Sequence, residues 1–505
     1  MRVEIVVDRA AARAWHARLR GRLIRLLPDA DIRFSFAAGD NGLPSPAEHL
    51  ITLERLLLRQ RGASLWDRAE LAGAAANADF QPDVVIDCTG REPAAQAGAA
   101  RTLRPLYDGH ASERAAAAAL LGGASPAIGL ENSTDGRLAA VGLPSLEAAD
   151  GLTGGMEAVA SRVITLIERA LLSPASASPA TLPRRSPARR RGATAFFLRA
   201  IAFHCARRIY HLCCYSPHWR IGWRFNEGPG VLERGDLAGP AWQALPDMGT
   251  AFAADPFPVV WLGRTFIFFE QLDHRVNKGT IFAQEFGADG PVGAPFLVLE
   301  EPWHLSYPFL IVQDGVLYMI PEASASGAVT LYRCVEFPQR WAPVAQLLTG
   351  VEAADATVFQ HAGRFWMTSV VRDGVGGYSD TLAIHHAAAL TGPWREHAQR
   401  PVLIDAASAR PAGAVVSKDG ALWRPVQDCS TGYGKRLGIA RIDTLDTERF
   451  SQSVTALIAP GPLWPGGRLH TLNRSGRLEC IDGAILTPKS RLLRRAAGLM
   501  RGAGR

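Results

Sequence analysis

Five residues that can form polar contacts or transfer protons recur through the C-terminal half of the chain at a spacing near fifty residues. They are Asp255, Tyr307, Asp355, Arg410 and His470, with separations of 52, 48, 55 and 60 residues. Four of the five can carry charge or transfer a proton, which acid–base chemistry and the binding of a charged substrate both require. A position chosen only for packing would be small or apolar. If the fold brings these residues together, they form one catalytic or binding site.

Each of the five residues begins a segment with the pattern of a β-hairpin. The first segment runs from Asp255 through a turn at Gly263 to a second strand that ends near Glu270. In the first three copies the turn glycine lies eight residues after the start. A repeat of about fifty residues that opens on a hairpin is typical of a β-propeller blade of about four strands. We therefore predict an all-β five-bladed β-propeller over residues 218–488, with the five starts facing its central channel.

A second regularity adds carboxylates to the expected site. Glu270 and Glu322 lie seven residues after the turn glycines of the first two copies, and Gln427 has the same offset in the fourth. Because a buried carboxylate without a purpose is costly, Glu322 joins Asp255 and Asp355 as a catalytic candidate. The candidate substrate-binding residues are Arg410, His470, Tyr307, His304 and Glu270. Each candidate also has a structural alternative, such as a blade cap for an aspartate, an ion pair for Arg410 or a core position for a histidine.

Residues 1–172 have the pattern of an α/β domain with a Rossmann-like parallel sheet. Strands are expected at 3–7, 32–36 and 82–90, and helices up to residue 27 and at 47–61. The first strand is followed by Asp8 without the glycines of a dinucleotide fingerprint, so no nucleotide cofactor is expected. The strand order and the turn Asp87-Cys88-Thr89-Gly90 resemble the formyltransferase-like fold. The segment His-x-Ser-Leu-Leu-Pro of that family is missing, which implies a degenerate domain without catalysis.

The basic charge of the chain is concentrated in two segments. The formal net charge is +7, but residues 169–226 contain eleven arginines and no acid, and residues 489–505 contain six cations and no acid. We interpret residues 173–217 as a basic linker followed by an amphipathic helix, and 489–505 as a basic C-terminal tail. The basic segments 184–224 and 489–505 are expected to dock on an anionic membrane surface. The alternative is a helix that packs on the propeller and exposes its arginines. No nucleic acid is expected as a partner, because no motif for it accompanies the charge.

Several features favour a cytoplasmic protein that is peripheral at the inner face of the membrane. The first residues contain Glu4 where a secretory signal would carry basic residues, and no apolar run reaches the ~18–20 residues of a spanning helix. The seven cysteines form no metal-type CxxC pair, which suits a reducing compartment.

The propeller segment resembles the five-bladed propellers of glycoside hydrolase family 43. The resemblance is carried by Asp255-Pro256-Phe257, Phe268-Phe269-Glu270 and the run 390–394, Leu-Thr-Gly-Pro-Trp. In that family a blade-one aspartate is the general base, a blade-three aspartate tunes pKa values, and a glutamate that opens blade four is the acid. Asp255 and Asp355 match the first two positions. Arg410 stands where the acid is expected, so Glu322 or Glu270 would have to supply the second carboxyl for inverting hydrolysis.

Residues 218–485 more closely resemble the propeller domain of the glucosamine inositolphosphorylceramide transferase family. The motifs are residues 304–309 (His-Leu-Ser-Tyr-Pro-Phe), 319–324 (Met-Ile-Pro-Glu-Ala-Ser), 355–357 (Asp-Ala-Thr), 410–413 (Arg-Pro-Ala-Gly), 424–430 (Arg-Pro-Val-Gln-Asp-Cys-Ser) and 469–473 (Leu-His-Thr-Leu-Asn). This resemblance implies a role in assembling a glycolipid or a surface polysaccharide.

Together these patterns predict a carbohydrate-active propeller protein that acts on a glycan or glycolipid by glycosyl transfer. Two alternatives stay open. One is an inverting glycoside hydrolase of the family 43 type, and the other is a sugar-binding propeller without catalysis that serves a partner glycosyltransferase. The retained carboxylates favour an enzyme, whereas Arg410 in the position of the acid favours the binding protein. No metal and no cofactor is expected.

Overall fold

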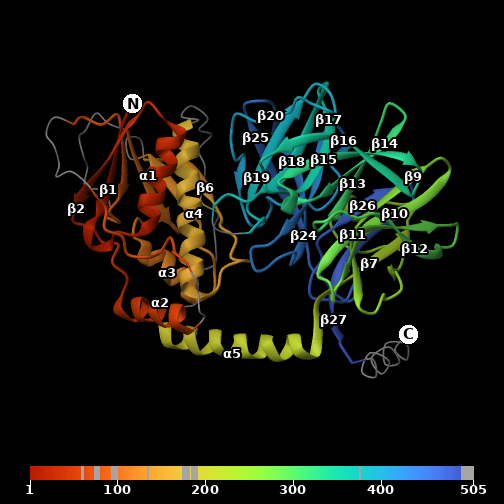
Figure 1. The fold of residues 1–505 in the computed structure, drawn as a ribbon, viewed down its shortest axis with the longest axis horizontal. Coiled ribbons are helices and arrows are strands. Elements are labelled where there is room, and N and C mark those ends of the chain that lie inside the picture. The colour runs from red at the N-terminus through yellow and green to blue at the C-terminus, as the bar shows by residue number, and fades with distance from the viewer. Residues whose placement is uncertain are drawn as a thin grey trace. The chain divides into compact units, whose positions relative to one another are not determined.

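The computed structural model describes residues 1–57, 62–72, 80–91, 101–132, 136–172, 182, 192–374 and 377–490. The chain divides into two compact units (Figure 1). Unit one contains Met1–Phe203 with the short segments Asp373–Gly377 and Leu403–Ala406, and unit two contains the rest of the chain. Most of the predicted linker and nearly all of the predicted basic tail lie outside the described residues.

Unit one is built on a six-stranded sheet with the strand order β2-β1-β3-β4-β5-β6. The strands are β1 (Arg2–Asp8), β2 (Asp31–Ala37), β3 (Val84–Cys88), β4 (Arg101–Tyr107), β5 (Ile128–Asn132) and β6 (Arg137–Gly142). The pairings from β2 through β4 are parallel, whereas β4–β5 and β5–β6 are antiparallel. The sheet is therefore mixed rather than wholly parallel as predicted, and the Rossmann-like and formyltransferase-like assignments stay predictions.

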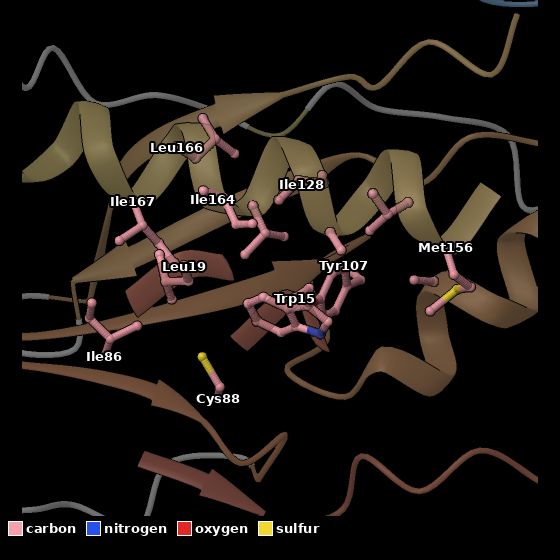
Figure 2. Close-up of a cluster of buried hydrophobic side chains, with 14 of the residues drawn as sticks. Trp15, Leu19, Ile86, Cys88, Tyr107, Ile128, Met156, Ile164, Leu166 and Ile167 are labelled. Carbon is pink, nitrogen blue, oxygen red and sulfur yellow. The ribbon is translucent and has the colours of Figure 1, made fainter. Parts of the chain in front are cut away.

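The helices of unit one bury a continuous apolar core against this sheet. They are α1 (Ala14–Leu26), α2 (Ser45–Leu57), α3 (Glu113–Gly122) and α4 (Gly151–Leu172), with a short 3-10 turn η1 (Arg9–Ala11). Figure 2 shows side chains of α4 such as Met156 and Ile164 together with Trp15 and Leu19 of α1. Burying a side chain of this size stabilises the fold by about 1.5–3 kcal/mol. The 22-residue helix α4 is thus the main apolar cover of the sheet.

Unit two is a five-bladed β-propeller, as predicted. Blade one contains β9 (Ala251–Trp261), β10 (Arg264–Asp273), β11 (Lys278–Phe286) and β12 (Pro291–Leu299), and blade two contains β13 (Ser306–Gln313), β14 (Val316–Glu322), β15 (Ala328–Glu336) and β16 (Arg340–Thr349). Blade three contains β17 (Ala353–His361), β18 (Arg364–Val371), β19 (Thr381–Ala387) and β20 (Arg395–Glu396), and blade four contains β22 (Val416–Lys418), β23 (Ala421–Asp428), β24 (Arg436–Leu445) and β25 (Phe450–Ile458). The short elements η2 (Ser324–Ser326) and α6 (Val231–Arg234) also belong to unit two, whereas β21 (Leu403–Ile404) lies in a segment of unit one. All five predicted hairpins are present.

Blade five is assembled from two distant parts of the sequence. Its strands are β26 (Leu472–Ser475), β27 (Leu478–Pro488), β7 (Cys214–Phe225) and β8 (Gln243–Ala244). The strand β27 pairs with β7 along almost its whole length, from Leu478 opposite Phe225 to Pro488 opposite Cys214. The sequence repeat did not reveal this closure, because β7 precedes the first copy of the repeat. Pairing the ends of the ring leaves fewer exposed strand edges.

The amphipathic helix predicted to follow the linker within residues 173–217 is present as α5 (Ala193–Cys213), directly before β7. In the part of α5 that belongs to unit two, Arg207 and Arg208 on one side and Ile209 and Leu212 on the other are all exposed. The side chain of His204 lies outside the described set. The alternative prediction was a helix whose apolar side packs on the propeller. Ile209 and Leu212 do not pack in this way.

Candidate functional site

The inner strands of the first three blades, β9, β13 and β17, share the same unusual backbone near their N-terminal ends. Asp255, Tyr307 and Asp355 have φ angles of 52°, 42° and 56°, in the left-handed region that residues other than glycine rarely adopt. The pairing register of each inner strand shifts at this point. A non-glycine residue held in this region costs about 1–3 kcal/mol, and such strain gathers at functional sites. The repeated bulge therefore marks these three positions as equivalent.

Asp255, in blade one, has its hydrogen-bonding partners in blade five. Its Oδ1 accepts a hydrogen bond of 2.7 Å from the Thr471 hydroxyl and lies 3.8 Å from Nε2 of His470. The side chain is buried, and burial raises the pKa of Asp255 to about 6, although the His470 ring acts in the opposite direction. A carboxyl with this pKa is ionised at neutral pH and can still accept a proton, which is what a general base requires.

Asp482 fixes the geometry around Asp255. It is fully buried in β27, and its oxygens accept hydrogen bonds from the backbone N–H groups of Asp255, His470 and Thr471 at 3.0–3.2 Å. It also contacts Nδ1 of His470 at 2.7 Å. The face of the His470 ring stacks on the ring of Trp219, with 3.8 Å between the ring centroids. Asp482 therefore holds His470 with Nε2 directed towards Asp255.

The charge on His470 depends on the two carboxylates. Burial opposes the protonated ring, but Asp482 and Asp255 outweigh it and raise the pKa of His470. His470 is thus a second group beside Asp255 that can hold a proton.

Asp355, in blade three, has a cationic partner. Arg410 Nε donates to its Oδ2 at 2.6 Å, and Gln427 Nε2 donates to the same oxygen at 3.3 Å. Burial raises the pKa of Asp355, whereas Arg410 acts to lower it. Arg410 itself is nine-tenths buried and lies over the ring of Tyr433, with its guanidinium carbon 4.8 Å from the ring centroid. Arg410 is therefore bound inside the protein as the partner of Asp355.

Tyr307 completes the inner wall between these two carboxylates. Its hydroxyl forms a hydrogen bond of 2.9 Å with Thr357, and its ring packs edge-on against Phe257 at 4.7 Å between centroids. Burial, followed by the charge of Asp355, raises the pKa of Tyr307 well above its ordinary value. Its hydroxyl therefore stays protonated and acts as a structural hydrogen-bonding group.

Glu270, His304 and Glu322 form a second cluster of predicted site residues. Nε2 of His304 lies 3.2 Å from Glu270 Oε1, and Nδ1 of His304 accepts from the Gly279 N–H at 3.0 Å. Burial lowers the pKa of His304, but the contact with Glu270 outweighs it, so that the net shift is upward. Glu322 is half-buried and accepts hydrogen bonds from the Ser306 hydroxyl and the Ser324 N–H.

Electrostatic effects connect the residues around Asp255 and Asp355 with the cluster of Glu270, His304 and Glu322. The charge of Asp255 raises the pKa of Asp355, and Glu322 adds to that effect, while Glu270 raises the pKa of Asp255. The positive charge of Arg410 acts on His470. The predicted residues from all five blade starts therefore share one electrostatic environment.

Within the described residues, Asp255, His470 and Asp482 have potential ligand atoms that lie within 4.8 Å of one another. That spacing would suit a cation. Hydrogen bonds nevertheless account for the group, because the Asp482 oxygens accept three backbone N–H groups and the Thr471 hydroxyl donates to Asp255. We assign no metal to these residues.

The sequence reasoning did not identify Asp482, Thr471 or Trp219 as part of the site. A weak signal for Asp482 existed, because it lies six residues after Gly476, one residue short of the offset shared by Glu270 and Glu322. Trp219 gave no signal, since it belongs to β7, outside the repeats.

The family model for the N-terminal domain of glucosamine inositolphosphorylceramide transferase 1 matches residues 241–475. The curated protein of this name from Arabidopsis thaliana is 32% identical over 250 residues, which cover 47% of this chain and 32% of the relative. The protein from Oryza sativa subsp. indica is 30% identical over 256 residues, which cover 46% and 34%. The match confirms the family resemblance predicted for the propeller. The chain spans about a third of the length of these relatives.

Solved structures with a similar chain include a GH43_1 enzyme from Xanthomonas citri, at 14% identity and a TM-score of 0.33, covering 48% of this chain and 89% of that one. Zg3597, a family 117 glycoside hydrolase from Zobellia galactanivorans, has 12% identity and a TM-score of 0.33, covering 54% and 91%.

Proposed function

We propose that the propeller carries out glycosyl transfer to a glycolipid, with Asp255 as the general base. The names of the matching relatives support a sugar transfer to an inositolphosphorylceramide-type lipid. One observation carries the proposal for this chain. Asp255 keeps the position and the raised pKa of a base, whereas Arg410 occupies the blade start at which a hydrolase of the family 43 type would need its acid.

The absence of an acid at this blade start fits transfer better than hydrolysis. A hydrolase must protonate the leaving sugar oxygen. A donor whose leaving group is already an anion, such as a phosphate ester of a sugar, needs no such proton. In this step the acceptor hydroxyl gives its proton to a carboxylate oxygen of Asp255. The acceptor oxygen bonds to the anomeric carbon, and the leaving group departs with the electron pair of the broken C–O bond.

Sugar binding without catalysis is the second candidate. It is favoured by the burial of the carboxylates, since Asp255 is 5% exposed and Asp355 is 2% exposed, and both already have partners inside the protein. In this case the propeller would present a glycan to a partner glycosyltransferase. The hydrolase alternative requires Glu322 or Glu270 to act as the acid.

The variant Asp255→Asn separates these functions. It keeps the size of the side chain but removes its ability to take up a proton. If Asp255 is the base, turnover falls by roughly 100-fold or more, while glycan affinity stays near the parent value and the melting temperature does not fall. If the propeller only binds sugar, affinity falls and the parent itself shows no turnover. If Asp255 is a blade cap, only the melting temperature falls.

The matched control is Asp314→Asn. Asp314 also has a positive φ, 51°, but it lies in the exposed turn between β13 and β14. We expect parent values for it in all three measurements. Mass spectrometry of the products, with water or a glycolipid as the acceptor, distinguishes transfer from hydrolysis. An Asp255→Asn protein with parent values throughout would contradict any role for this residue.

A further inference from the structure

A cationic pocket of about 680 Å³ lies beside the last blade of unit two, apart from the carboxylate cluster. Its lining includes Arg220, Lys435 and Arg468 together with Tyr210, Ile485 and Leu486. No acidic side chain lines this pocket among the described residues. The surface therefore combines positive charge with an apolar wall.

The pocket lies at the end of the propeller where the inner strands start. Arg468 pairs with Ala484 two residues before the blade start His470. Arg220 follows Trp219, whose ring stacks on His470. The pocket is therefore a close neighbour of the residues that surround Asp255.

The cations are held in place by neutral groups. Lys435 Nζ donates to the carbonyl of Gly467 at 3.2 Å, and Arg468 Nη1 donates to the carbonyl of Tyr433 at 2.9 Å. The guanidinium of Arg220 lies over the Trp464 ring, 4.1 Å from its centroid. The carbonyls orient Lys435 and Arg468, and among the described residues no ion pair neutralises these two cations. The pocket thus keeps positive charge that an anion such as a phosphodiester can balance.

Helix α5 extends this surface with exposed apolar side chains. Tyr210 of α5 lines the pocket, and its neighbours Ile209 and Leu212 are 64% and 76% exposed. Arg207 and Arg208 are exposed on the same helix. Exposed apolar residues beside cations are typical of a helix that lies in the headgroup region of a membrane. No helix in the described part of the chain is long and apolar enough to cross a bilayer.

We propose that this pocket binds the headgroup phosphate of an anionic membrane lipid, while Ile209 and Leu212 of α5 enter the headgroup layer. The inference rests on the proposed function in one respect, since it would bring a lipid acceptor to the mouth of the propeller. It assigns a phosphate subsite to Lys435 and Arg468.

The test measures co-sedimentation of the full chain with vesicles of phosphatidylcholine alone or with added phosphatidylinositol. The parent should bind the anionic vesicles, and added salt should weaken binding because exposed charges are screened. The variant Lys435→Gln/Arg468→Gln should bind about twenty-five-fold more weakly, since each cation beside an anionic surface contributes about five-fold. Leu212→Gln should weaken binding to the same vesicles through the apolar contact.

The matched control is Lys418→Gln/Arg477→Gln, which removes the same charges from blades four and five. Lys418 and Arg477 border the hairpin turns β22–β23 and β26–β27, at the opposite end of these blades. Equal vesicle binding by the pocket variant and this control would overturn the proposal. So would a pocket variant that loses affinity for soluble inositol phosphate but not for vesicles, because the site would then serve a free phosphate. Sugar transfer to a detergent-solubilised acceptor, measured separately, reports on the proposed function whatever the vesicles show.

Discussion

Asp255 and Asp355 lie at the bulges of the inner strands β9 and β17 with nearly the same backbone conformation, but their side chains face different partners. Asp255 contacts a hydroxyl and a histidine, whereas Asp355 is bound by a guanidinium and an amide. The repeated bulge places a buried acid on the inner strand, and a neighbouring blade supplies the partners of that acid. His470, which lies beside Asp255, can take up or release a proton, whereas Arg410 beside Asp355 keeps its charge.

The largest loss of stability is expected when Asp355 loses its cationic partner. Arg410→Met leaves the carboxylate of Asp355 buried beside Gln427 alone, and losing one member of a buried ion pair costs about 3–5 kcal/mol. Urea unfolding measures the loss. Arg264→Met is the control, because its pair with Glu285 is exposed to solvent and should contribute little to stability. Equal losses in the two variants would show that Arg410 is not a structural partner.

The next effect concerns the group that orients His470. Asp482→Asn replaces an acceptor of three backbone N–H groups by an amide with one oxygen. At least one buried donor loses its partner, so we expect a loss of about 2 kcal/mol in the free energy of unfolding. If Asp482 also positions His470, the pH profile of turnover shifts in the folded variant. A stability loss with an unchanged pH profile would limit Asp482 to a structural role.

The pH dependence of protein stability tests the raised pKa of Asp255 directly. The pKa of Asp255 is about 6 in the folded protein and about 3.9 in an unfolded chain. The folded state thus favours the protonated form, and this contribution is complete below about pH 4 and lost as the pH rises through about 6. Between these values the parent should lose about 2 kcal/mol relative to Asp255→Asn. Parallel stability curves for the two proteins would contradict the raised pKa.

The smallest effect is expected at the start of blade two, where neither carboxylate is changed. Tyr307→Phe keeps the ring against Phe257 but removes the hydrogen bond to Thr357. A loss of about 1 kcal/mol in the free energy of unfolding is expected, with little change in turnover. A large loss of turnover would mean that the hydroxyl touches the substrate.

The repeat in the sequence was sufficient to predict the five blades and to select Asp255, Tyr307 and Asp355 as equivalent positions. A hairpin with a turn glycine is a local pattern, so its period can be read from one chain. The partners of these residues are non-local. Thr471 and Asp482 lie more than two hundred residues from Asp255, and nothing in the sequence around Arg410 shows that it faces Asp355.

Non-local contacts also explain the two predictions outside the site that differ from the structure. The two antiparallel strands of unit one, β5 and β6, contain ordinary strand residues, and their direction depends on how the chain returns to the sheet. For α5, the pattern of arginines and apolar residues predicted the helix but not that both sides would be exposed.

The pairing of β27 with β7 also has a consequence for synthesis. At about 5–20 residues per second, the roughly 250 residues between Phe225 and Leu478 take on the order of 10–50 seconds to make. During that time β7 is complete while the strand it pairs with does not yet exist. His470, which lies beside Asp255, is made near the end of this interval, and Asp482 is made just after it. A growing chain thus gains this part of its site only after β27 is made, and until then the side of β7 that pairs with β27 is an open strand edge.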